Sequence, residues 1–428
     1  MKIVIVGSSH AGITLYDKRN QVSFVSQGII SYLAGQKSVL NQSSYSSVEE
    51  LKAAGLNMQM ETVVEEIDTK NKRLFYRRDN SKKTKLALYD KLIFATGSYP
   101  AMTSVPFDKK SKLYFLKSMD DAIKTDEFLK TAKNIAVIGG GMTGVEVARI
   151  AQERGIQTTL IHRNKNLLND YLDEPASHLL ESWMNAEGTR LLLNTEVTEI
   201  GFDEENTIIQ TANGQKIPVD GVIFTIGFRP NSYLLNQQVE LGDSGAVIVD
   251  EYMQTTCPDV FAVGDVSTTY VNLLEKSYYL PHASDAVRDG EIAAINLLAP
   301  HQKINSSQGT YHVPMNNLVM AMTGITIRQA VDAGYDADAV HLLNEHLDGH
   351  SPSNIWMIYE RRTHQILGLQ CIGKTSDMAE YVNIFSLAIQ QELKIEDIEF
   401  TDFYFEHGYK DPRGLNRILA RLVRENER

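Results

Sequence analysis

Cysteine is nearly absent from this chain of 428 residues, which contains only Cys257 and Cys371. Two thiols exclude a disulfide framework, and so few suit a protein kept in a reducing cytoplasm. They could form a redox pair. We expect instead that each is a small apolar side chain beside a strand.

The sequence also lacks a basic excess, a signal peptide and a long apolar run. Its 42 Lys and Arg are outnumbered by 54 Asp and Glu, a formal net charge of −12, which argues against a nucleic-acid or membrane-surface partner. MKIVIVGSS passes directly into an apolar strand rather than a signal peptide, and no apolar stretch approaches the roughly 18 residues of a membrane span. We therefore expect a cytoplasmic protein with no membrane association. Because 428 residues exceed one hydrophobic core, two or three domains are expected.

The most informative segment is residues 134–164, NIAVIGGGMTGVEVARIAQERGIQTTLIHRN. An apolar strand leads to a glycine turn, an apolar-striped helix and a second strand. Gly139, Gly141 and Gly144 form G-x-G-x-x-G in the strand–turn–helix context that gives this pattern meaning. The helix N-terminus would offer free N–H groups to a pyrophosphate. The segment predicts a dinucleotide site, and the alternative is a glycine-rich packing turn.

The N-terminus, KIVIVGSSHAG, begins the same pattern, with Gly7 and Gly12 after a strand. ITLYDK follows at once and is expected to be the second strand, ending in Asp17, an acid placed to accept hydrogen bonds from a ribose. A parallel crossover needs about a dozen residues, usually a helix, and almost none are supplied here. The first crossover is therefore shortened. Either the chain has a true deletion, or the sequence lacks a segment, which an unbridgeable gap between Gly12 and Ile13 would reveal.

Two further strand ends carry candidate ligand-binding residues. The strand in KLIFATGSYP ends at Thr96 and Gly97, and the strand in PDVFAVGD ends at Gly264 and Asp265. Ligands of open α/β sheets bind beyond the carboxyl ends of the strands, so both turns are predicted to face a cofactor. The alternative for each is a plain surface turn. Helices are expected at residues 118–130, 175–187 and 280–298, β-strands within 58–89, and a short strand turning into a helix at 22–35.

The last third of the chain changes character. From about residue 305, strands alternate and lead to an apolar helix, MAEYVNIFSLAIQQ, and then to the aromatic run FTDFYFEHGY. An antiparallel sheet with helices on one face, rich in large apolar side chains, is a candidate subunit interface. Core packing explains the aromatic residues nearly as well.

The chain as a whole resembles the FAD-dependent pyridine nucleotide-disulfide oxidoreductases, and is most similar to bacterial NADH oxidases, NADH peroxidases and coenzyme A disulfide reductases. The segments that carry the resemblance, in order, are KIVIVGSSHAG, VSFVSQG, ATG, GGGMTGVE, IGFRPN, PDVFAVGD, LAIQ and DFYFEHGYKDP. The resemblance implies an α/β fold with two Rossmann-like dinucleotide-binding domains built on parallel sheets, and an α+β C-terminal dimerisation domain. It places a split FAD-binding domain at residues 1–115 and 248–304, an NAD(P)-binding domain at 116–247 and the dimerisation domain at 305–428.

The resemblance also implies which residues bind FAD and NAD(P)H; none is a metal ligand. The FAD phosphates and adenosine ribose would be contacted by Gly7, Ser8, Ser9, His10, Ala11, Gly12, Asp17 and Lys18. The flavin would be lined by Thr96, Gly97, Ser98, Lys117, Gly264, Asp265 and Ala283. The nicotinamide nucleotide would be held by Gly139, Gly141, Thr143, Gly144, His162, Arg163, Tyr171 and Gly227.

Besides the short crossover, the chain departs from the family at the residues expected to be catalytic. Gln27 occupies the position of the family's redox cysteine, and a glutamine amide cannot form a thiolate, a sulfenic acid or a mixed disulfide. His10 matches the histidine that stabilises that cysteine. It either keeps a role near flavin or oxygen, or is a phosphate-side or inert residue. Met142 and Thr143 stand where the family usually has a large aromatic gate.

A further departure lies at the end of the second strand of the central unit. His162 replaces the acid that would bind the adenosine 2′-hydroxyl, and Arg163 follows. A carboxylate there repels a 2′-phosphate, whereas His and Arg can pair with one. We therefore expect NADPH to be tolerated or preferred; the alternative is a solvated strand end.

These residues predict a flavin-dependent NAD(P)H oxidoreductase that passes a hydride from NAD(P)H to FAD and then reduces oxygen, as an NADH oxidase does, or another small acceptor. Without a redox cysteine, the expected product from oxygen is hydrogen peroxide. The expected assembly is a homodimer. The alternative is a catalytically degenerate relative that acts as a nucleotide-binding or structural dimer, which the missing cysteine and the short crossover favour.

Overall fold

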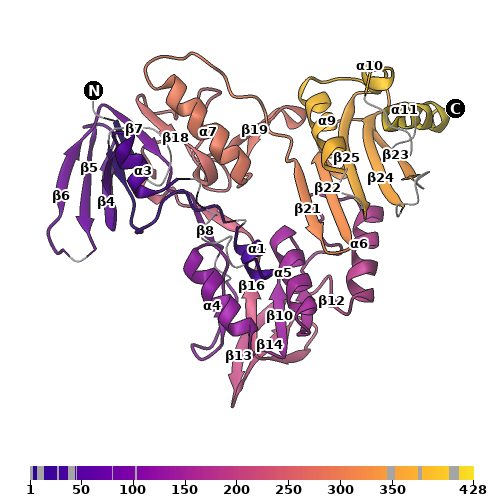
Figure 1. The fold of residues 1–428 in the computed structure, drawn as a ribbon, viewed down its shortest axis with the longest axis horizontal. Helices are drawn as coiled ribbons and strands as arrows, with labels where there is room; N and C mark the ends of the chain where they lie inside the picture. Colours follow the sequence, from indigo (N-terminus) through magenta and orange to yellow (C-terminus); the bar gives the residue numbers. More distant parts are fainter. Residues whose placement is uncertain are drawn as a thin grey trace.

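The computed structural model describes residues 3–6, 14–26, 28–36, 44, 46–79, 81–101, 104–344, 352–374, 378–403 and 414–428. These residues form three units that meet around a common centre (Figure 1). Two are built on parallel five-stranded sheets and the third on an antiparallel five-stranded sheet. The expected α/β class, with a C-terminal α+β unit, is confirmed.

The first unit is split in sequence. The strands of its sheet, all parallel and in spatial order, are β3 (Asn57–Gln59), β2 (Thr14–Tyr16), β1 (Ile3–Val6), β7 (Lys91–Phe94) and β18 (Val260–Ala262). Helices α3 (Val48–Ala53) and α7 (Ala283–Asn296) contribute to one apolar core against this sheet. The antiparallel strands β4 (Thr62–Asp68), β5 (Arg73–Arg78) and β6 (Lys85–Leu88) contribute to the other.

Helix α1 (Gly28–Leu33) forms where a helix was expected, but the short strand predicted just before it does not. Phe24 makes only an isolated bridge to Ser44. Ser23 has φ of 59°, and this left-handed residue interrupts the extended backbone that a strand requires.

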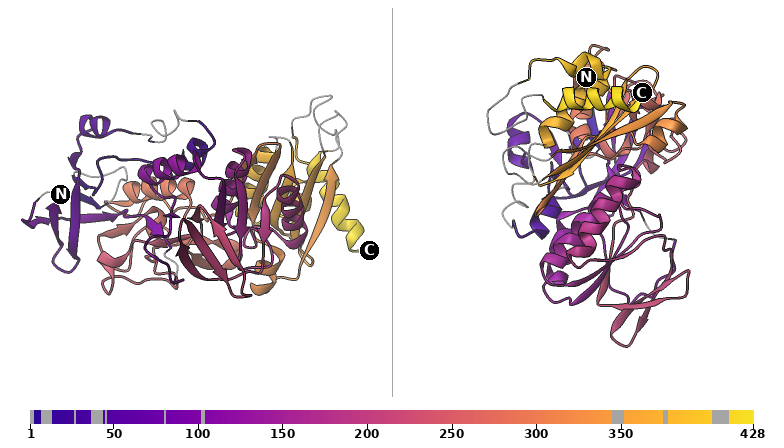
Figure 2. Two further views of the ribbon diagram at one scale, coloured as in Figure 1. Left: turned by 90° about the horizontal axis from the view of Figure 1, so that it is seen from below. Right: turned by 90° about the vertical axis from the view of Figure 1, so that its right-hand side faces the viewer.

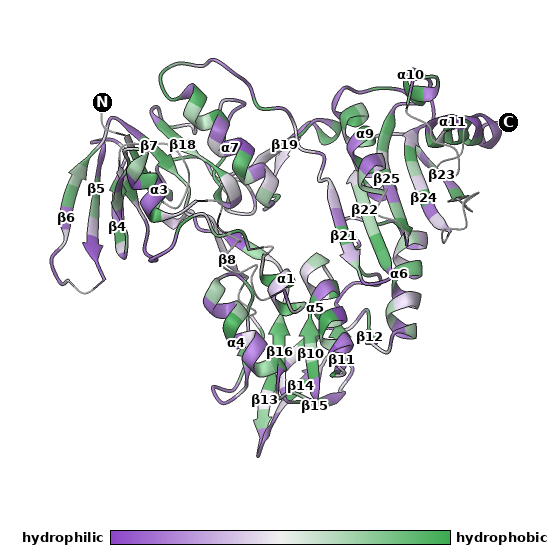
Figure 3. Ribbon diagram, viewed as in Figure 1, coloured by the Kyte–Doolittle hydropathy of each residue, from purple (hydrophilic) through white to green (hydrophobic). Residues whose placement is uncertain are grey.

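The central unit holds the glycine-rich segment. In spatial order its parallel sheet runs β12 (Arg190–Leu192), β11 (Gln157–Ile161), β10 (Asn134–Ile138), β16 (Gly221–Phe224) and β9 (Leu113–Tyr114). Its helices are α4 (Met119–Leu129), α5 (Met142–Glu153) and α6 (Glu174–Ala186), and a small antiparallel sheet is formed by β13 (Val197–Asp203), β14 (Asn206–Thr211) and β15 (Lys216–Val219). Apolar residues concentrate in the central strands β10 and β16 (Figure 3).

Two short segments join the first two units. Strand β8 (Ser98–Pro100) pairs antiparallel with β17 (Phe228–Pro230), so the chain crosses between the units twice at one place. Beyond β17, Leu234 and Leu235 in the short helix η1 (Tyr233–Leu235) pack into a core of the first unit. Because β9 pairs in the central sheet, we propose that the central unit runs from about Leu113 to Pro230 rather than from 116 to 247.

The third unit is an antiparallel sheet between helices. Its strands, in spatial order, are β21 (Tyr311–Met315), β22 (Leu318–Gly324), β25 (Ile366–Gly373), β24 (Ser353–Glu360) and β23 (Ala337–Asn344). Helices α9 (Met378–Gln390), α10 (Ile395–Glu399) and α11 (Leu415–Asn426) share a core with one face, and α8 (Ile327–Asp332) lies beside β23. Helix α6 of the central unit lies against β25 (Figure 2).

The alternation of side chains along β25 explains this two-sided packing. Cys371 points into the core under α9, whereas Ile372 belongs to the core shared with the central unit. Gln370 also faces the central unit, because its side-chain amide donates to Asp173 Oδ2 at 2.8 Å and its oxygen accepts from the Asp173 N–H at 2.9 Å. The central and C-terminal units are therefore joined by a buried apolar contact and a polar clamp.

Candidate active site at the junction of the three units

A large cleft lies where the three units meet. Its volume is about 1680 Å³, well above the roughly 300–1,000 Å³ of a pocket for one small ligand. It is lined by the carboxyl ends of β7 and β18 from the first sheet, the glycine turn of the central unit, and Tyr311 of the third. The cleft therefore has room for two nucleotide ligands.

The glycine turn between β10 and α5 has the geometry of a phosphate cradle. Gly139 has φ of 117°, and a Cβ there would lie 2.4 Å from the Thr225 carbonyl oxygen, so only glycine fits. Gly141 is the N-cap of α5; a Cβ there would point into open space, and no side chain caps the helix. The first N–H groups of α5 are thus left for a ligand at the cleft wall. Gly144 packs directly under Gly139 and does not line the cleft.

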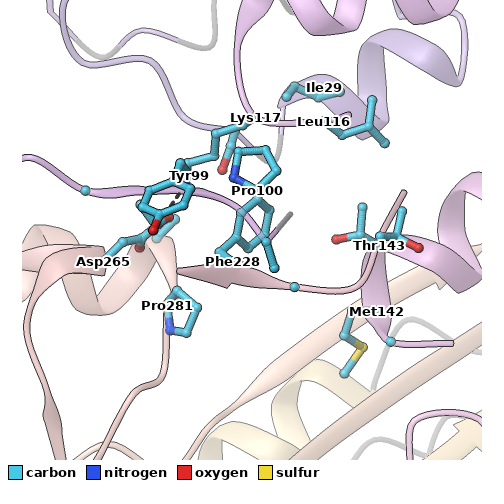
Figure 4. Close-up of a pocket in the computed structure, with 18 of the residues that line it drawn as sticks. Ile29, Tyr99, Pro100, Leu116, Lys117, Met142, Thr143, Phe228, Asp265 and Pro281 are labelled. Atoms are coloured by element: carbon cyan, nitrogen blue, oxygen red, sulfur yellow. Dashed lines mark hydrogen bonds and ion pairs between the residues drawn. The ribbon is translucent and has the colours of Figure 1, made fainter. Parts of the chain in front are cut away.

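The opposite side of the cleft is built around Asp265 (Figure 4). Its Oδ2 accepts hydrogen bonds from Ser98 Oγ at 2.7 Å and from Lys117 Nζ at 2.7 Å. The Lys117 ammonium also lies 4.6 Å from the ring centre of Phe228. These side chains come from β8, β17 and the ends of two strands, and they leave hydroxyl, ammonium and carboxylate groups facing a cleft with apolar walls. Such a donor set suits the polyol chain of a flavin.

Helix α7 begins at the same wall. Its N-cap, His282, has no side-chain cap bond to the helix, so the N-terminal N–H groups of this 14-residue helix face the cleft beside Ala283. A Cβ at Gly97, whose φ is 67°, would meet no atom within 4 Å. The open backbone at Gly97 and the uncapped helix leave space and N–H donors for a flat ligand such as a flavin ring. The described residues therefore fit this half of FAD.

Three groups near the cleft were not identified from the sequence. Burial raises the pKa of Glu146, on α5, to about 7, and burial raises that of Asp289, which accepts a hydrogen bond from the Gly264 N–H, to about 7. Burial lowers the pKa of His282, whose ring lies 4.7 Å from that of Tyr311. The sequence signal that could have found Glu146 is an acid near the N-terminal end of the helix that follows the glycine turn.

The cleft brings together most of the site residues expected from the sequence. Those that line it are Asp17, Lys18, Thr96, Gly97, Ser98, Lys117, Gly139, Gly141, Thr143, His162, Arg163, Tyr171, Gly227, Gly264, Asp265 and Ala283. Seven predicted residues lie outside the described residues: Gly7, Ser8, Ser9, His10, Ala11, Gly12 and Gln27. The junction of Gly12 and Ile13, where a missing segment would leave a gap, also lies outside the described residues. The roles of all these residues remain predictions.

Two expectations need correction or limits. Asp17 is buried and its carboxylate already accepts from the Arg19 backbone N–H at 2.8 Å and from the Arg19 guanidinium at 3.1 Å, so it is not a free ribose acceptor. His162 is not free either. Its Nδ1 accepts from the Gly140 N–H at 3.0 Å and its Nε2 lies 3.1 Å from Asn169 Oδ1. Both ring nitrogens therefore have partners within the protein, which argues against the expected pairing of this ring with a 2′-phosphate.

The two cysteines do not form a redox pair. Cys371 is buried in the third unit, whereas Cys257 packs at the edge of a core of the first unit. Burial raises the pKa of the Cys371 thiol far above its usual range. Among the described residues, no group of three or more His, Cys, Asp or Glu side chains is arranged to hold a metal ion, and no helix is long and apolar enough to cross a bilayer.

Comparison with known proteins agrees with this architecture. Residues 1–290 match the family described as pyridine nucleotide-disulphide oxidoreductase, and residues 313–405 match the dimerisation domain of that family. A curated relative, the NADH oxidase of Enterococcus faecalis, is 32% identical over 446 aligned positions that cover 100% of both chains.

Solved structures give the same result. The water-forming NADH oxidase of Lactobacillus brevis bound to NADH has a TM-score of 0.95 and 30% identity, over 100% of this chain and 99% of that one. An engineered water-forming NADPH oxidase bound to NADPH has a TM-score of 0.96 and 30% identity, over the same shares. The fold, the cleft between the three units and these similarities lead to one conclusion: the chain belongs to the pyridine nucleotide-disulphide oxidoreductase family.

Proposed function

We propose that this protein is a flavin-dependent NAD(P)H oxidoreductase that uses oxygen or another small acceptor. One observation carries the proposal: the flavin-side wall at Asp265 and the glycine turn at Gly139 open into one cleft. When bound, FAD takes a hydride from NAD(P)H and passes two electrons to the acceptor. The chain itself positions the two nucleotides and keeps their reacting ends together.

The residues divide this work. The uncapped N-terminus of α5 holds the pyrophosphate of the nicotinamide nucleotide, and the open backbone at Gly141 lets it approach. Asp265, Lys117 and Ser98 hold the polyol chain of the flavin. Tyr171 packs edge-on against Tyr311, with ring centres 5.2 Å apart, and closes the cleft on the side of the third unit.

The product expected from oxygen is hydrogen peroxide. NAD(P)H and one proton supply two electrons and two hydrogens to O₂, which gives NAD(P)⁺ and H₂O₂. Further reduction of peroxide in this family would need the redox thiol, and the chain has Gln27 at that position. The measurement is peroxide formed per NAD(P)H consumed. We expect a ratio near one; stoichiometric water would contradict the argument, and a colourless, flavin-free protein would favour the degenerate alternative.

Gly141→Asp tests the nucleotide cradle without disturbing the fold. Gly141 has φ of −80° and an open Cβ direction, so aspartate fits and is a good helix N-cap. The aspartate carboxylate would occupy the pyrophosphate position and repel the negative charge of the pyrophosphate. We expect unchanged or higher thermal stability, loss of flavin reduction by NAD(P)H, and unchanged reoxidation by oxygen after dithionite reduction. Gly141→Ser, a neutral cap, is the matched control. Normal reduction of the aspartate variant by NAD(P)H would reject the site.

The proposed assembly is a homodimer formed through the third unit. Its support is the match of residues 313–405 to a dimerisation domain, and two large apolar side chains, Leu387 and Phe400, that are 60% and 74% exposed. Light scattering should give the mass of two chains, and Leu387→Glu should shift the protein toward monomer; an unshifted mass would remove this surface from the interface. The scarcity of cysteine supports a cytoplasmic location.

A further inference from the structure

The strand end at which a nicotinamide nucleotide presents its adenosine ribose is unusual in this chain. In NAD sites of this fold a carboxylate there accepts hydrogen bonds from the ribose hydroxyls, and it repels a 2′-phosphate. Here β11 ends at Ile161 and is followed by His162 and Arg163. Neither is acidic. The hydroxyl acceptor of an NAD-selective site is therefore missing at this position.

His162 cannot replace that acceptor, because its ring is used by the protein itself. The Gly140 N–H donates to Nδ1, so Nδ1 carries the lone pair and the proton is on Nε2, which donates to Asn169 Oδ1. The Asn169 amide in turn donates to Asp170, and the same Asn169 oxygen accepts from Asn164. This network fixes the orientation of the amide. Burial lowers the pKa of His162, so the ring is neutral at physiological pH.

The close packing of His162 also explains why residue 140, between the first two glycines of the motif, is itself glycine. A Cβ at Gly140 would lie 2.7 Å from the His162 Cγ. The imidazole therefore packs against the phosphate-binding turn and accepts a hydrogen bond from one of its N–H groups. His162 positions the turn and makes no contact with the ribose hydroxyls.

Arg163, in contrast, is exposed and free to bind. It lines the large cleft and also a smaller adjoining hollow of about 550 Å³. The neighbouring cations are already paired, Lys165 with Glu174 at 2.5 Å and Arg328 with Asp170 at 3.1 Å. Arg163 has no ion-pair partner among the described residues. The other residues of the hollow are Asn164, Asn194, Thr195, Glu196, Ala212 and Asn213.

We propose that Arg163 makes this site selective for a nucleotide that carries a 2′-phosphate, so that NADPH is preferred over NADH. A guanidinium binds a phosphate through two parallel hydrogen bonds, which gives both strength and geometric selectivity. No carboxylate at the strand end opposes it. Glu196 is the one acid that lines the hollow, and its charge limits the preference. The inference rests on the proposed function only in placing the adenosine end of the nucleotide here.

The test is a binding measurement that needs neither flavin nor turnover. Calorimetric titration of the full chain with 2′,5′-ADP and with 5′-AMP compares the two nucleotide halves directly. We expect 2′,5′-ADP to bind about ten- to hundredfold more tightly, the range for a charge-assisted phosphate contact. Arg163→Gln should bring the two affinities together. Lys165→Gln is the matched control: it removes a neighbouring exposed cation that is already paired, and it should leave the ratio unchanged.

Two further variants separate selection from folding. His162→Asp restores an acceptor for ribose hydroxyls, still accepts the Gly140 N–H, and should reverse the preference toward 5′-AMP. Glu196→Gln should strengthen 2′,5′-ADP binding alone. Equal affinities in the unaltered chain, or an unchanged ratio in Arg163→Gln, would overturn the inference and leave the proposed function intact. Binding of neither ligand would overturn both.

Discussion

Raising the pH is expected to loosen the C-terminal helix α11. The end of this helix is held by a histidine, His364, whose ring lies between two carboxylates. His364 Nδ1 lies 2.5 Å from Glu396 Oε1 on α10, and its Nε2 lies 2.8 Å from Glu427 Oε2 at the end of α11. Burial alone would lower the pKa of His364, but the two hydrogen-bonded carboxylates outweigh it, and the pKa is raised. Both nitrogens can donate only in the imidazolium form.

The direction of the effect follows from this shift. The unfolded chain has a histidine pKa of about 6.5, so the stabilisation is complete below that pH and is lost as the pH rises through the higher folded pKa. The His364 side chain is 25% exposed, so each contact is worth about 1 kcal/mol rather than the 1.5–3 of a buried one. Losing one contact should increase opening of α11 about fivefold.

Hydrogen exchange of residues 415–426 measures this opening directly. After correction for intrinsic rates, protection should fall about fivefold between about pH 6 and pH 8.5, and His364→Gln should be weakly protected at both. Arg421→Gln is the control, because its 3.7 Å pair with Glu425 lies on α11 and does not involve the histidine. Asp338 and the Tyr359 hydroxyl also contact this end of α11, through Asn426. Protection that is constant or rises with pH in the unaltered chain would refute the reasoning.

Two other outcomes follow from contacts in and near the cleft. Lys117→Met leaves the Asp265 carboxylate, 19% exposed, without its cation, and should lower the free energy of unfolding by about 1–3 kcal/mol. Adding Asp265→Asn should recover part of that loss. Strictly additive effects of the two substitutions in urea denaturation would contradict the coupling. A maleimide should label only the half-buried Cys257 in the folded protein, because Cys371 is fully buried. NAD(P)H oxidation should survive this labelling. Two labels by mass spectrometry, or loss of activity, would show a thiol that the structure does not place at the site.

The local features of the nucleotide cradles could be predicted because they depend on residues close together in sequence. The turn at Gly139 needs a backbone that only glycine adopts, and it is flanked by a strand and a helix whose apolar periods differ. Asp265 could be placed for a similar reason, since an acid directly after an apolar strand lies at the carboxyl edge of a sheet. In both cases, the physical cause of the structure lies within a few residues.

The features that could not be predicted depend on residues far apart in sequence. Lys117 and Asp265 are 148 positions apart, and their ion pair exists only because β8 and β17 join the first two units. The orientation of the His162 side chain likewise could not be predicted from the sequence. A histidine at this position could face a ligand or turn inward, and it turns inward because its Nδ1 accepts a hydrogen bond from the Gly140 N–H.

The short first crossover can be reconciled with an intact parallel sheet by a distance argument. Strands β1 and β2 are so short that Thr14 lies beside Val4, only two residues back from the end of β1 at Val6. The return path is about 8 Å, from roughly 3.3 Å per residue along the strand and 4.8 Å across it, and residues 7–13 can span more than 20 Å. The sheet therefore does not need a crossover helix to form.

The small number of residues between β1 and β2 also limits what the first crossover can contribute to FAD binding. A helix of several turns with its N-terminus at the FAD pyrophosphate needs its own residues in addition to the connection, and the sequence between Val6 and Thr14 has seven in all. The flavin half keeps Asp265, Lys117 and the N-terminus of α7, which come from other parts of the chain. Flavin affinity in this protein should therefore come mainly from the ring and polyol contacts. We therefore expect weaker cofactor retention than a full crossover helix would give, with the flavin oriented by Asp265, Lys117 and the N-terminus of α7.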